Sequence, residues 1–444
     1  MSATTATFEE FRESLQHLGE YAGTKPLSDE EAVSRAKRAF AAGLDGHLAL
    51  DLETCIHCGM CAEACHFYEA TEDPKYSPVY KFRLLRRFYR REMSPMRLLY
   101  RPFTRDIKAD DLETWAELVY ESCTGCGRCD MMCPMGINLS RLIDVMREGL
   151  AEAGYIPTEL RALQEEQQDC GTIFGVGTRQ FLDRVEKLRA DGVDIHVDRD
   201  RADILLLTTA QEIMLFPGTL AASAKILNMT DADWTLRSDA FEASNLGLVS
   251  GDTATQKAVT ENIVAAARAC GAKTVLVPES GHAYQALRWE AANQLGEELP
   301  FEVLALSEYV DQKFRSGGLT LQEPRDDETV TYHDPCRLAR HGGVLNEPRH
   351  VLTALGYSLR NTSAHRRDNH CCGGGCAEYV IKRSANVRQR AWEIKRREFD
   401  EAGAKQVVTS CENCRINLMI GAENAGWETP ITSFAEIVAD RLAD

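Results

Sequence analysis

The sequence predicts an α+β protein of several domains, in which a helical, cysteine-rich part precedes a duplicated α/β part. Two runs of four cysteines with identical spacing fall between residues 50 and 135. From about residue 200, short apolar strands alternate with helical stretches, a pattern typical of α/β domains. Two similar segments begin at Gly271 and Gly403, 132 residues apart, and indicate an internal repeat.

Composition and charge exclude several classes of protein. The 444 residues are 44% hydrophobic and 27% charged, so the chain is not mainly disordered. A net charge of −17 argues against nucleic-acid binding, which needs a basic face. The sequence has no apolar run of about 20 residues and no apolar segment near Met1. We therefore expect a cytoplasmic protein that can still attach to a membrane through a partner.

Residues 1–49 predict two short helices. Ser28 and Glu31 fit a capping box, in which Ser28 caps the second helix and Glu31 reaches back to it. Gly43 is a natural end for this helix.

The 16 cysteines are the most informative feature, because clustered cysteines in a reducing compartment are typical of metal or redox sites. Only Cys170 and Cys270 stand apart, and for these we expect small buried side chains. The two runs share the pattern C-x2-C-x2-C-x3-C. In this pattern three cysteines of one run bind a [4Fe-4S] cluster, and the fourth binds the cluster of the other run. The predicted ligands are Cys55, Cys58, Cys61 and Cys133 for cluster 1, and Cys123, Cys126, Cys129 and Cys65 for cluster 2.

A structural zinc site would need only four ligands and no repeated run, so we favour two cubane clusters. Gly59, Gly125 and Gly127 allow the backbone to approach the clusters. The 57 residues between Cys65 and Cys123 indicate a helical ferredoxin-like domain with a large insert.

The insert is strongly basic. Residues 81–108 hold ten Lys and Arg residues and two acidic ones, about +8 within an acidic chain, and apolar residues interleave with the charges. Two interpretations remain open: a docking surface for an acidic partner or anionic lipid headgroups, and an insert that packs its apolar face on the cluster domain.

The α/β part predicts four strands, at Asp203–Leu207, Thr274–Val277, Val330–His333 and Gln406–Thr409. The repeat aligns Glu279 with Cys411 and His282 with Cys414, so the first copy lacks the cysteines of the second. We expect Glu279 and His282 to be ordinary surface or helix-start residues rather than metal ligands.

A third cysteine group lies near the C-terminus, with three glycines, Gly373–Gly375, that let the backbone press against a cluster. It comprises Cys336, Cys371, Cys372, Cys411 and Cys414. Its spacing, together with the sequence HDPC around Cys336 and the pair Pro348-Arg349, resembles that of the CCG-domain proteins of the heterodisulfide reductase family. The two upstream runs make the chain most similar to the fused ferredoxin–CCG type of that family.

This resemblance implies a non-cubane [4Fe-4S] cluster on those five cysteines, where a disulfide is cleaved or formed. Cys376 stands where the family usually has glycine, and it could be an additional ligand, a sulfur-carrying thiol or a packed thiol. The resemblance also implies a sulfur substrate, either a small disulfide or a sulfur-carrier protein. Three histidines beside ligand cysteines are candidate proton donors, and two arginines could hold an acidic substrate: His333, His341, His370, Arg337 and Arg340.

The resemblance implies a subunit bound to a membrane cytochrome b-type protein at the cytoplasmic face of the inner membrane. A second hypothesis is an electron relay beside a flavin dehydrogenase, with no sulfur substrate and with a flavoprotein subunit as partner. The expected domains are an N-terminal helical segment, a ferredoxin-like domain with its basic insert, a degenerate first CCG half and a second CCG half with the catalytic cluster. Their boundaries are 1–49, 50–155 with the insert at 75–115, 156–325 and 326–444.

Overall fold

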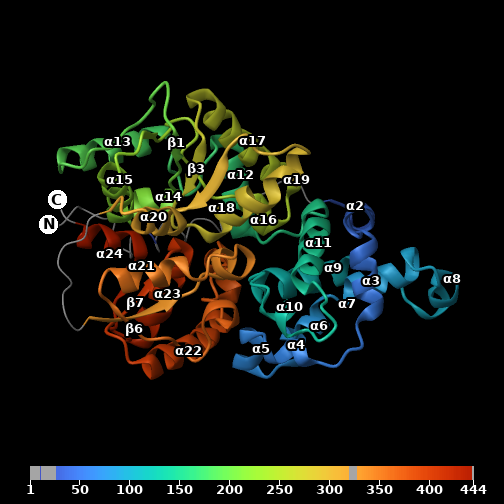
Figure 1. Ribbon diagram of the computed structural model, residues 1–444. Coiled ribbons are helices and arrows are strands. Elements are labelled where there is room, and N and C mark those ends of the chain that lie inside the picture. The colour runs from blue at the N-terminus through green and yellow to red at the C-terminus, as the bar shows by residue number, and fades with distance from the viewer. Residues whose placement is uncertain (1–10, 12–26, 320–327, 443–444) are drawn as a thin grey trace.

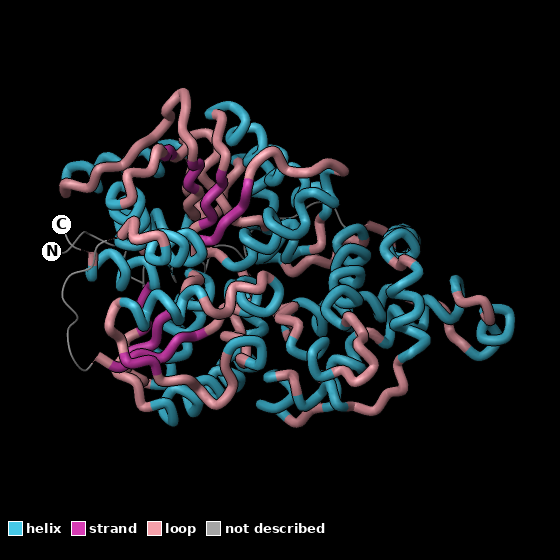
Figure 2. The backbone as a smooth tube through the Cα atoms, viewed as in Figure 1, coloured by secondary structure: helices cyan, strands magenta, loops and turns pink. Residues whose placement is uncertain are grey.

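The structure, a computed structural model, describes residue 11 and residues 27–319 and 328–442. Figure 1 shows a helical region with two α/β regions beside it, and Figure 2 shows that the strands fall in two separate groups. Within the described residues, none of the helices is both long and apolar enough to cross a bilayer.

The N-terminal region is made of short helices that wrap around the first two cysteine runs. They are α2 (Asp29–Gly43), α3 (Gly46–Thr54), α4 (Met60–Glu63), α5 (His66–Thr71), η2 (Pro74–Tyr76), α6 (Pro78–Lys81), α7 (Arg83–Phe88), η3 (Tyr89–Met93), α8 (Arg97–Tyr100), η4 (Arg101–Phe103), α9 (Ala109–Ala116), η5 (Glu117–Glu121), α10 (Arg128–Met132) and α11 (Leu139–Glu152).

Helix α2 begins and ends as the sequence predicts. The Ser28 side chain accepts a hydrogen bond from the Glu31 backbone N–H, and the helix ends at Gly43. The reciprocal half of the capping box is wrong, because the Glu31 carboxylate pairs with Arg35 one turn along the helix. The other predicted helix lies mostly outside the described residues. Helix α2 packs on α11, where a side chain at Gly149 would overlap the Phe40 ring.

The first α/β region contains a parallel sheet in the order β2-β1-β3-β4. Its elements are α12 (Thr158–Cys170), α13 (Thr178–Ala190), β1 (Ile204–Leu206), α14 (Ala210–Met214), α15 (Pro217–Met229), β2 (Trp234–Thr235), α16 (Leu246–Ser250), α17 (Thr253–Cys270), β3 (Thr274–Val277), α18 (Gly281–Gln285), η6 (Ala286–Glu290), α19 (Ala291–Leu295), β4 (Glu302–Ala305) and α20 (Leu306–Arg315).

The second α/β region repeats this arrangement with a parallel sheet in the order β6-β5-β7-β8. Its elements are β5 (Thr329–His333), η7 (Arg337–His341), α21 (Glu347–Ala354), β6 (Ser358–Leu359), η8 (Arg366–Asp368), η9 (Glu378–Val380), η10 (Lys382–Ser384), α22 (Ala385–Ala402), β7 (Gln406–Thr409), α23 (Glu412–Ala425), β8 (Ile431–Ser433) and α24 (Phe434–Arg441).

All four predicted strands are present, and each occupies a central position in its sheet. Ligands of parallel sheets gather at the carboxyl ends of the strands. Cys336 follows β5 and Cys411 follows β7, so neighbouring strands bring these two cysteines to the same edge of the second sheet.

For the basic insert, the structure confirms inward packing of the first part, while docking of the rest stays a prediction. Phe82, Leu85 and Phe88 are buried in the core of the helical region, so the first part of the insert packs inward. Leu98 and Phe103 are exposed, in α8 and η4, at the end of a projection on the right of Figure 1.

Candidate iron–sulfur site

The structure sorts the cysteines of the first two runs into two pockets. Cys55, Cys58, Cys61 and Cys133 line one pocket together with Phe82 and Ile137. Cys65, Cys123, Cys126 and Cys129 line the other, together with His66 and Lys81. Each pocket holds three cysteines of one run and the last cysteine of the other. All 16 cysteines of the chain are free, so none of these thiols is used up in a disulfide.

The two runs share an unusual backbone conformation. His57 and Gly125 are at equivalent positions with φ of 57° and 59°, and Gly59 and Gly127 are equivalent with φ of 83° and 71°. These left-handed positions bend the chain between successive cysteines, so that a single loop curls around its pocket.

The third cysteine group forms one buried cluster at the edge of the second sheet. Cys336, Cys371, Cys372, Cys411 and Cys414 are each at most 9% exposed and pack together. The Sγ atoms of Cys336 and Cys371 are 3.9 Å apart. The backbone N–H groups of Gly373 and Gly374 donate to the sulfurs of Cys371 and Cys372, at 3.4 Å each.

This donor set fits an iron–sulfur cluster. Hydrogen bonds from Cys371 and Cys414 hold the pKa of the Cys372 thiol well below its usual range, and Cys414 likewise lowers the pKa of Cys411. The partners shift the other way: hydrogen bonds with Cys126 and with Cys372 raise the pKa of Cys371 and of Cys414, respectively. Thiolates are the ligands that iron–sulfur clusters require, and backbone N–H donors stabilise their charge.

The residues that resemble the CCG family around these cysteines form the scaffold of the site. Asp334 is fully buried and forms a bidentate ion pair with Arg349, at 2.6 and 2.7 Å. Asp334 also accepts a hydrogen bond from the backbone of Arg366, in the approach to the Cys371 loop. Asn417 donates to the Cys372 carbonyl at 2.5 Å and accepts from Arg388.

The turn that follows Cys336 docks on the loop of the second run. Side chains of η7 donate to three consecutive carbonyls: Arg337 to Thr124, His341 to Gly125 and Arg340 to Cys126, at 3.4, 3.1 and 2.7 Å. Cys126 packs against the third cysteine group, and its thiol is hydrogen-bonded with Cys371. The second run and the third cysteine group are therefore in direct contact.

A buried ion pair between Arg147 and Glu378 also joins the helical region to the second α/β region. Arg147 in α11 pairs with Glu378 at 2.5 Å, and each side chain is 1% exposed. Arg147 also donates to the carbonyls of Cys123 and Val249. Burial raises the pKa of Glu378 to about 8, against the influence of Arg147. Sequence reasoning missed Arg147 and Glu378, because nothing near either residue indicates a pair 231 positions apart.

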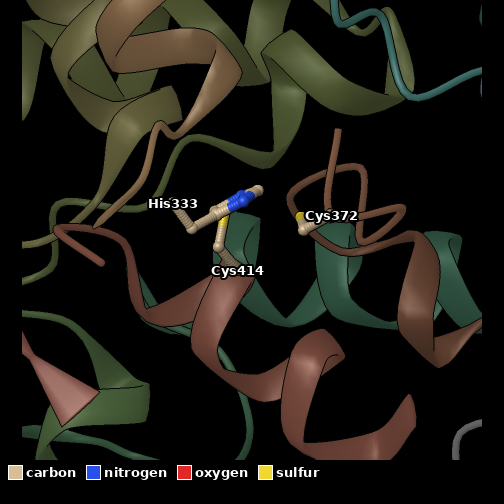
Figure 3. Close-up of side chains that lie close together, drawn as sticks. All are labelled: His333, Cys372 and Cys414. Atoms are coloured by element: carbon tan, nitrogen blue, oxygen red, sulfur yellow. The ribbon is translucent and has the colours of Figure 1, made fainter. Parts of the chain in front are cut away.

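His333 lies at the third cysteine group and His370 is turned to carboxylates. One ligand atom each from His333, Cys372 and Cys414 lies within 4.8 Å of the others (Figure 3). His370 instead contacts Glu398 through Nδ1 at 2.6 Å and Glu69 through Nε2 at 3.1 Å.

The two arginines that were candidates to hold substrate, Arg337 and Arg340, lie at the junction between the second run and the third cysteine group. Arg337 is buried, and Cys376, Asp144 and Cys336 lie near enough to its guanidinium to raise its pKa after burial is counted. Arg340 is bound by the carbonyls of Cys126, Arg367 and Asn369. Arg337 and Arg340 therefore hold the chain together at this junction.

Glu279 and His282 are buried, so the expectation of surface residues is wrong, while His282 does lie at the start of a helix, α18. The Glu279 carboxylate accepts from the Ala435 N–H at 2.7 Å, and the His282 ring accepts from the Asn245 N–H at 3.3 Å. Burial lowers the pKa of His282 to about 3, with Arg337 as a second cause. Cys270 is buried as predicted, but Cys170 is exposed at the end of α12, where the prediction was wrong.

Comparison with known proteins matches both halves of this architecture. Residues 51–137 match the family model of the 4Fe-4S dicluster domain, and residues 330–419 match that of the cysteine-rich domain known as CCG. The D subunit of the dihydromethanophenazine:CoB–CoM heterodisulfide reductase of Methanosarcina barkeri is 25% identical over 88% of this chain and 94% of its own length.

Two further relatives align over a similar span. Hdr-like menaquinol oxidoreductase iron–sulfur subunit 2 of Archaeoglobus fulgidus is 24% identical over 89% of this chain and 82% of its own length. The glycolate oxidase iron–sulfur subunit of Escherichia coli is 23% identical over 88% and 94%. The chain is thus a homologue of the D subunit of heterodisulfide reductase and of the Hdr-like iron–sulfur subunits, and it combines a 4Fe-4S dicluster domain with a CCG domain.

Proposed function

We propose that this protein is an iron–sulfur electron-transfer oxidoreductase that cleaves or forms a disulfide at its third cysteine group. The observation that carries the proposal is the packing of Cys126 of the second run against that group, where η7 donates to the carbonyls of Thr124, Gly125 and Cys126. A site reached only by diffusing thiols would not need this connection to a cluster-binding loop.

The proposed cofactors are two cubane [4Fe-4S] clusters in the two pockets and one non-cubane [4Fe-4S] cluster on the third cysteine group. The donor sets support this, since each pocket offers four sulfurs and the third group offers five. When bound, the cubane clusters would carry electrons singly, and the non-cubane cluster would hold substrate sulfur between the two one-electron steps that a disulfide requires.

The residues around the third group have separate tasks in this scheme. Gly373 and Gly374 aim their N–H groups at the sulfurs of Cys371 and Cys372 and offset the negative charge there. Arg337 places a buried positive charge between the second run and the third group. His333, against Cys372 and Cys414, is the residue best placed to deliver a proton to a departing thiolate.

The proposed domain organisation includes an internal duplication, with a first half at 156–325 and a second at 326–444. The two sheets support it through their identical strand order and parallel pairing. Glu279 and His282, which align with Cys411 and Cys414, hold backbone N–H groups instead of offering free ligands. The first half would therefore act as a structural platform for the second.

We propose a membrane cytochrome b-type protein as electron partner, with this chain on the cytoplasmic face of the inner membrane. The exposed first run supports a docking site there, because Ile56, His57 and Cys58 all face solvent.

Iron analysis and spectroscopy of anaerobically purified protein test the proposal. About twelve iron atoms per chain are expected, four for each cluster. A paramagnetic signal that depends on added thiol should appear in the oxidised protein. The variant Cys372→Ala should lose this signal and the disulfide chemistry but keep the two cubane signals. Iron near eight per chain would remove the catalytic cluster from the scheme.

A second candidate is an electron relay beside a flavoprotein, with no sulfur substrate. The similarity to the glycolate oxidase iron–sulfur subunit favours it, because that alignment spans both domains of this chain. The two candidates differ in the thiol experiment: a relay would bind its full iron and show no signal that responds to thiol.

A further inference from the structure

The basic insert ends in a projecting cap formed by residues 95–103, which include α8 and η4. Figure 1 shows this segment extending away from the rest of the molecule beyond α3. Phe103 and Leu98 are 87% and 82% exposed, the highest values for any large apolar side chain in the described residues. Leu99 and Met96 are also more than half exposed.

The cap is held in place from beneath by specific contacts. Arg91 donates to the carbonyls of Arg101 and Thr104, at 3.0 and 2.6 Å. Ser94 donates to Glu53 of α3 at 3.1 Å, and the Arg90 guanidinium lies over the Tyr100 ring. Apolar side chains on a tethered segment cannot bury themselves by folding back, and such exposure marks a contact site.

The arginines of the insert divide into two groups. Arg87 and Arg105 both pair with Asp111 at 2.5 Å, and Arg86 is buried against the Cys55 carbonyl. These charges are engaged within the insert and its surroundings. Arg97 and Arg101, by contrast, are exposed and flank the apolar side chains of the cap.

This combination fits a lipid surface better than a protein surface. A stable protein interface usually buries about 800 Å² on each partner, which a cap of nine residues cannot supply alone. Leu and Phe side chains with flanking Arg residues are typical of segments that enter the interface of an anionic bilayer. The chain as a whole carries a net charge of −17, so an anionic surface would repel it except at this basic insert.

We propose that residues 95–103 insert into the headgroup region of an anionic phospholipid bilayer. This deepens the proposed function by making a direct lipid contact part of its membrane association. Ser94, directly before the cap, donates to Glu53, and Arg86 donates to the Cys55 carbonyl. Insertion of the cap would therefore hold the first cysteine run close to the membrane plane. Leu50, in α3, and Ile56, just after it, are 63% and 66% exposed.

Co-sedimentation of the purified, iron-loaded full chain with vesicles tests this inference. Wild-type protein should bind vesicles of phosphatidylcholine mixed with phosphatidylglycerol and bind more weakly in high salt. The variant L98S/L99S/F103S should lose at least about tenfold in binding. The variant R97E/R101E should lose a similar factor on anionic vesicles. Matched controls are L182S and W289S for exposed apolar residues and R179E for an exposed arginine, all expected to bind as wild type.

Three outcomes would overturn the inference. They are wild-type protein that stays in the supernatant with anionic vesicles, cap variants that bind as well as wild type, and binding that needs a membrane protein in the vesicles. The last would show a protein contact instead of a lipid contact. Iron content and the thiol-dependent signal are measured on the same samples, so failure of the proposed sulfur chemistry would be seen separately from failure of membrane binding.

Discussion

The first and second cysteine runs have the same spacing and the same backbone bends, but they lie in opposite surroundings. In the first run, Ile56, His57 and Cys58 are exposed. In the second run, Thr124 and Gly125 are buried beneath η7. One run therefore faces solvent and the other faces the third cysteine group.

The difference explains why one position is histidine in one run and glycine in the other. His57 and Gly125 have nearly the same positive φ, so backbone conformation alone does not decide the residue. A Cβ at position 125 would overlap the Arg337 guanidinium, whereas position 57 opens to solvent. Contact with Arg337 of η7, rather than the cluster motif, favours glycine there.

The largest effect should come from breaking the buried junction at the second run. Arg147→Ala removes a buried guanidinium that pairs with Glu378 and donates to the Val119, Cys123 and Val249 carbonyls, and should lower the free energy of unfolding by about 3–5 kcal/mol. Arg83→Ala, at an exposed arginine near the first run, is the control and should change it little. Thermal denaturation of both variants measures this, and equal melting temperatures would contradict the central role of Arg147.

A pair of glycine substitutions separates backbone strain from contact. Gly59→Ala adds a side chain in open space at positive φ and should cost about 1 kcal/mol. Gly125→Ala carries the same strain and also displaces Arg337, so it should cost about 2–4 kcal/mol. The measurement is chemical denaturation together with iron content. Similar losses from both would show that η7 does not bear on the second run.

Two arginines, one beside each run, should set the reduction potentials of the two clusters. Arg337→Gln should lower the reduction potential of cluster 2, because it removes a buried positive charge beside that run. Arg86→Gln should do the same for cluster 1, where Arg86 donates to the Cys55 carbonyl at 3.3 Å. Each shift should be tens of millivolts. A redox titration followed by paramagnetic resonance measures both clusters, and a shift of the wrong cluster would contradict the assignment.

The smallest effect is expected from a substitution in the third cysteine group, at Cys376. Cys376 has a φ of 71°, a conformation that suits glycine, so Cys376→Gly should relieve about 1 kcal/mol of strain. The third group already offers five other cysteines, so iron per chain should be unchanged. A loss of iron would make Cys376 a cluster ligand.

The sequence predicts the central strands but not the edge strands, for a physical reason. Val275–Val277 and Val407–Val408 are buried and form continuous apolar runs. Two of the four edge strands, β2 and β6, have only two residues each, Trp234–Thr235 and Ser358–Leu359, and such short segments carry no periodicity. Shortness does not explain the edge strand β4, which has four residues. The cysteines lie in the two predicted sets around two pockets, and the clusters assigned to them stay a prediction.

The junction between the domains was not predicted, because it depends on packing across long separations. Arg337 was a candidate to hold substrate, and the structure shows it donating to Thr124 and Gln285. His370 was a candidate proton donor, and both of its ring nitrogens face carboxylates. Charged residues beside a cysteine motif look the same in a sequence whether they serve chemistry or assembly.

The clamp of η7 on three consecutive carbonyls also bears on the timing of turnover. Where two redox domains must move together before an electron can pass, the domain motion limits the rate of electron transfer, and that rate falls as solvent viscosity rises. Here the second run and the third cysteine group are already joined by Arg337, Arg340 and His341. Electron transfer between the second run and the third cysteine group would then need no domain motion. The slow steps of turnover would be the binding and release of the electron partner and of the substrate.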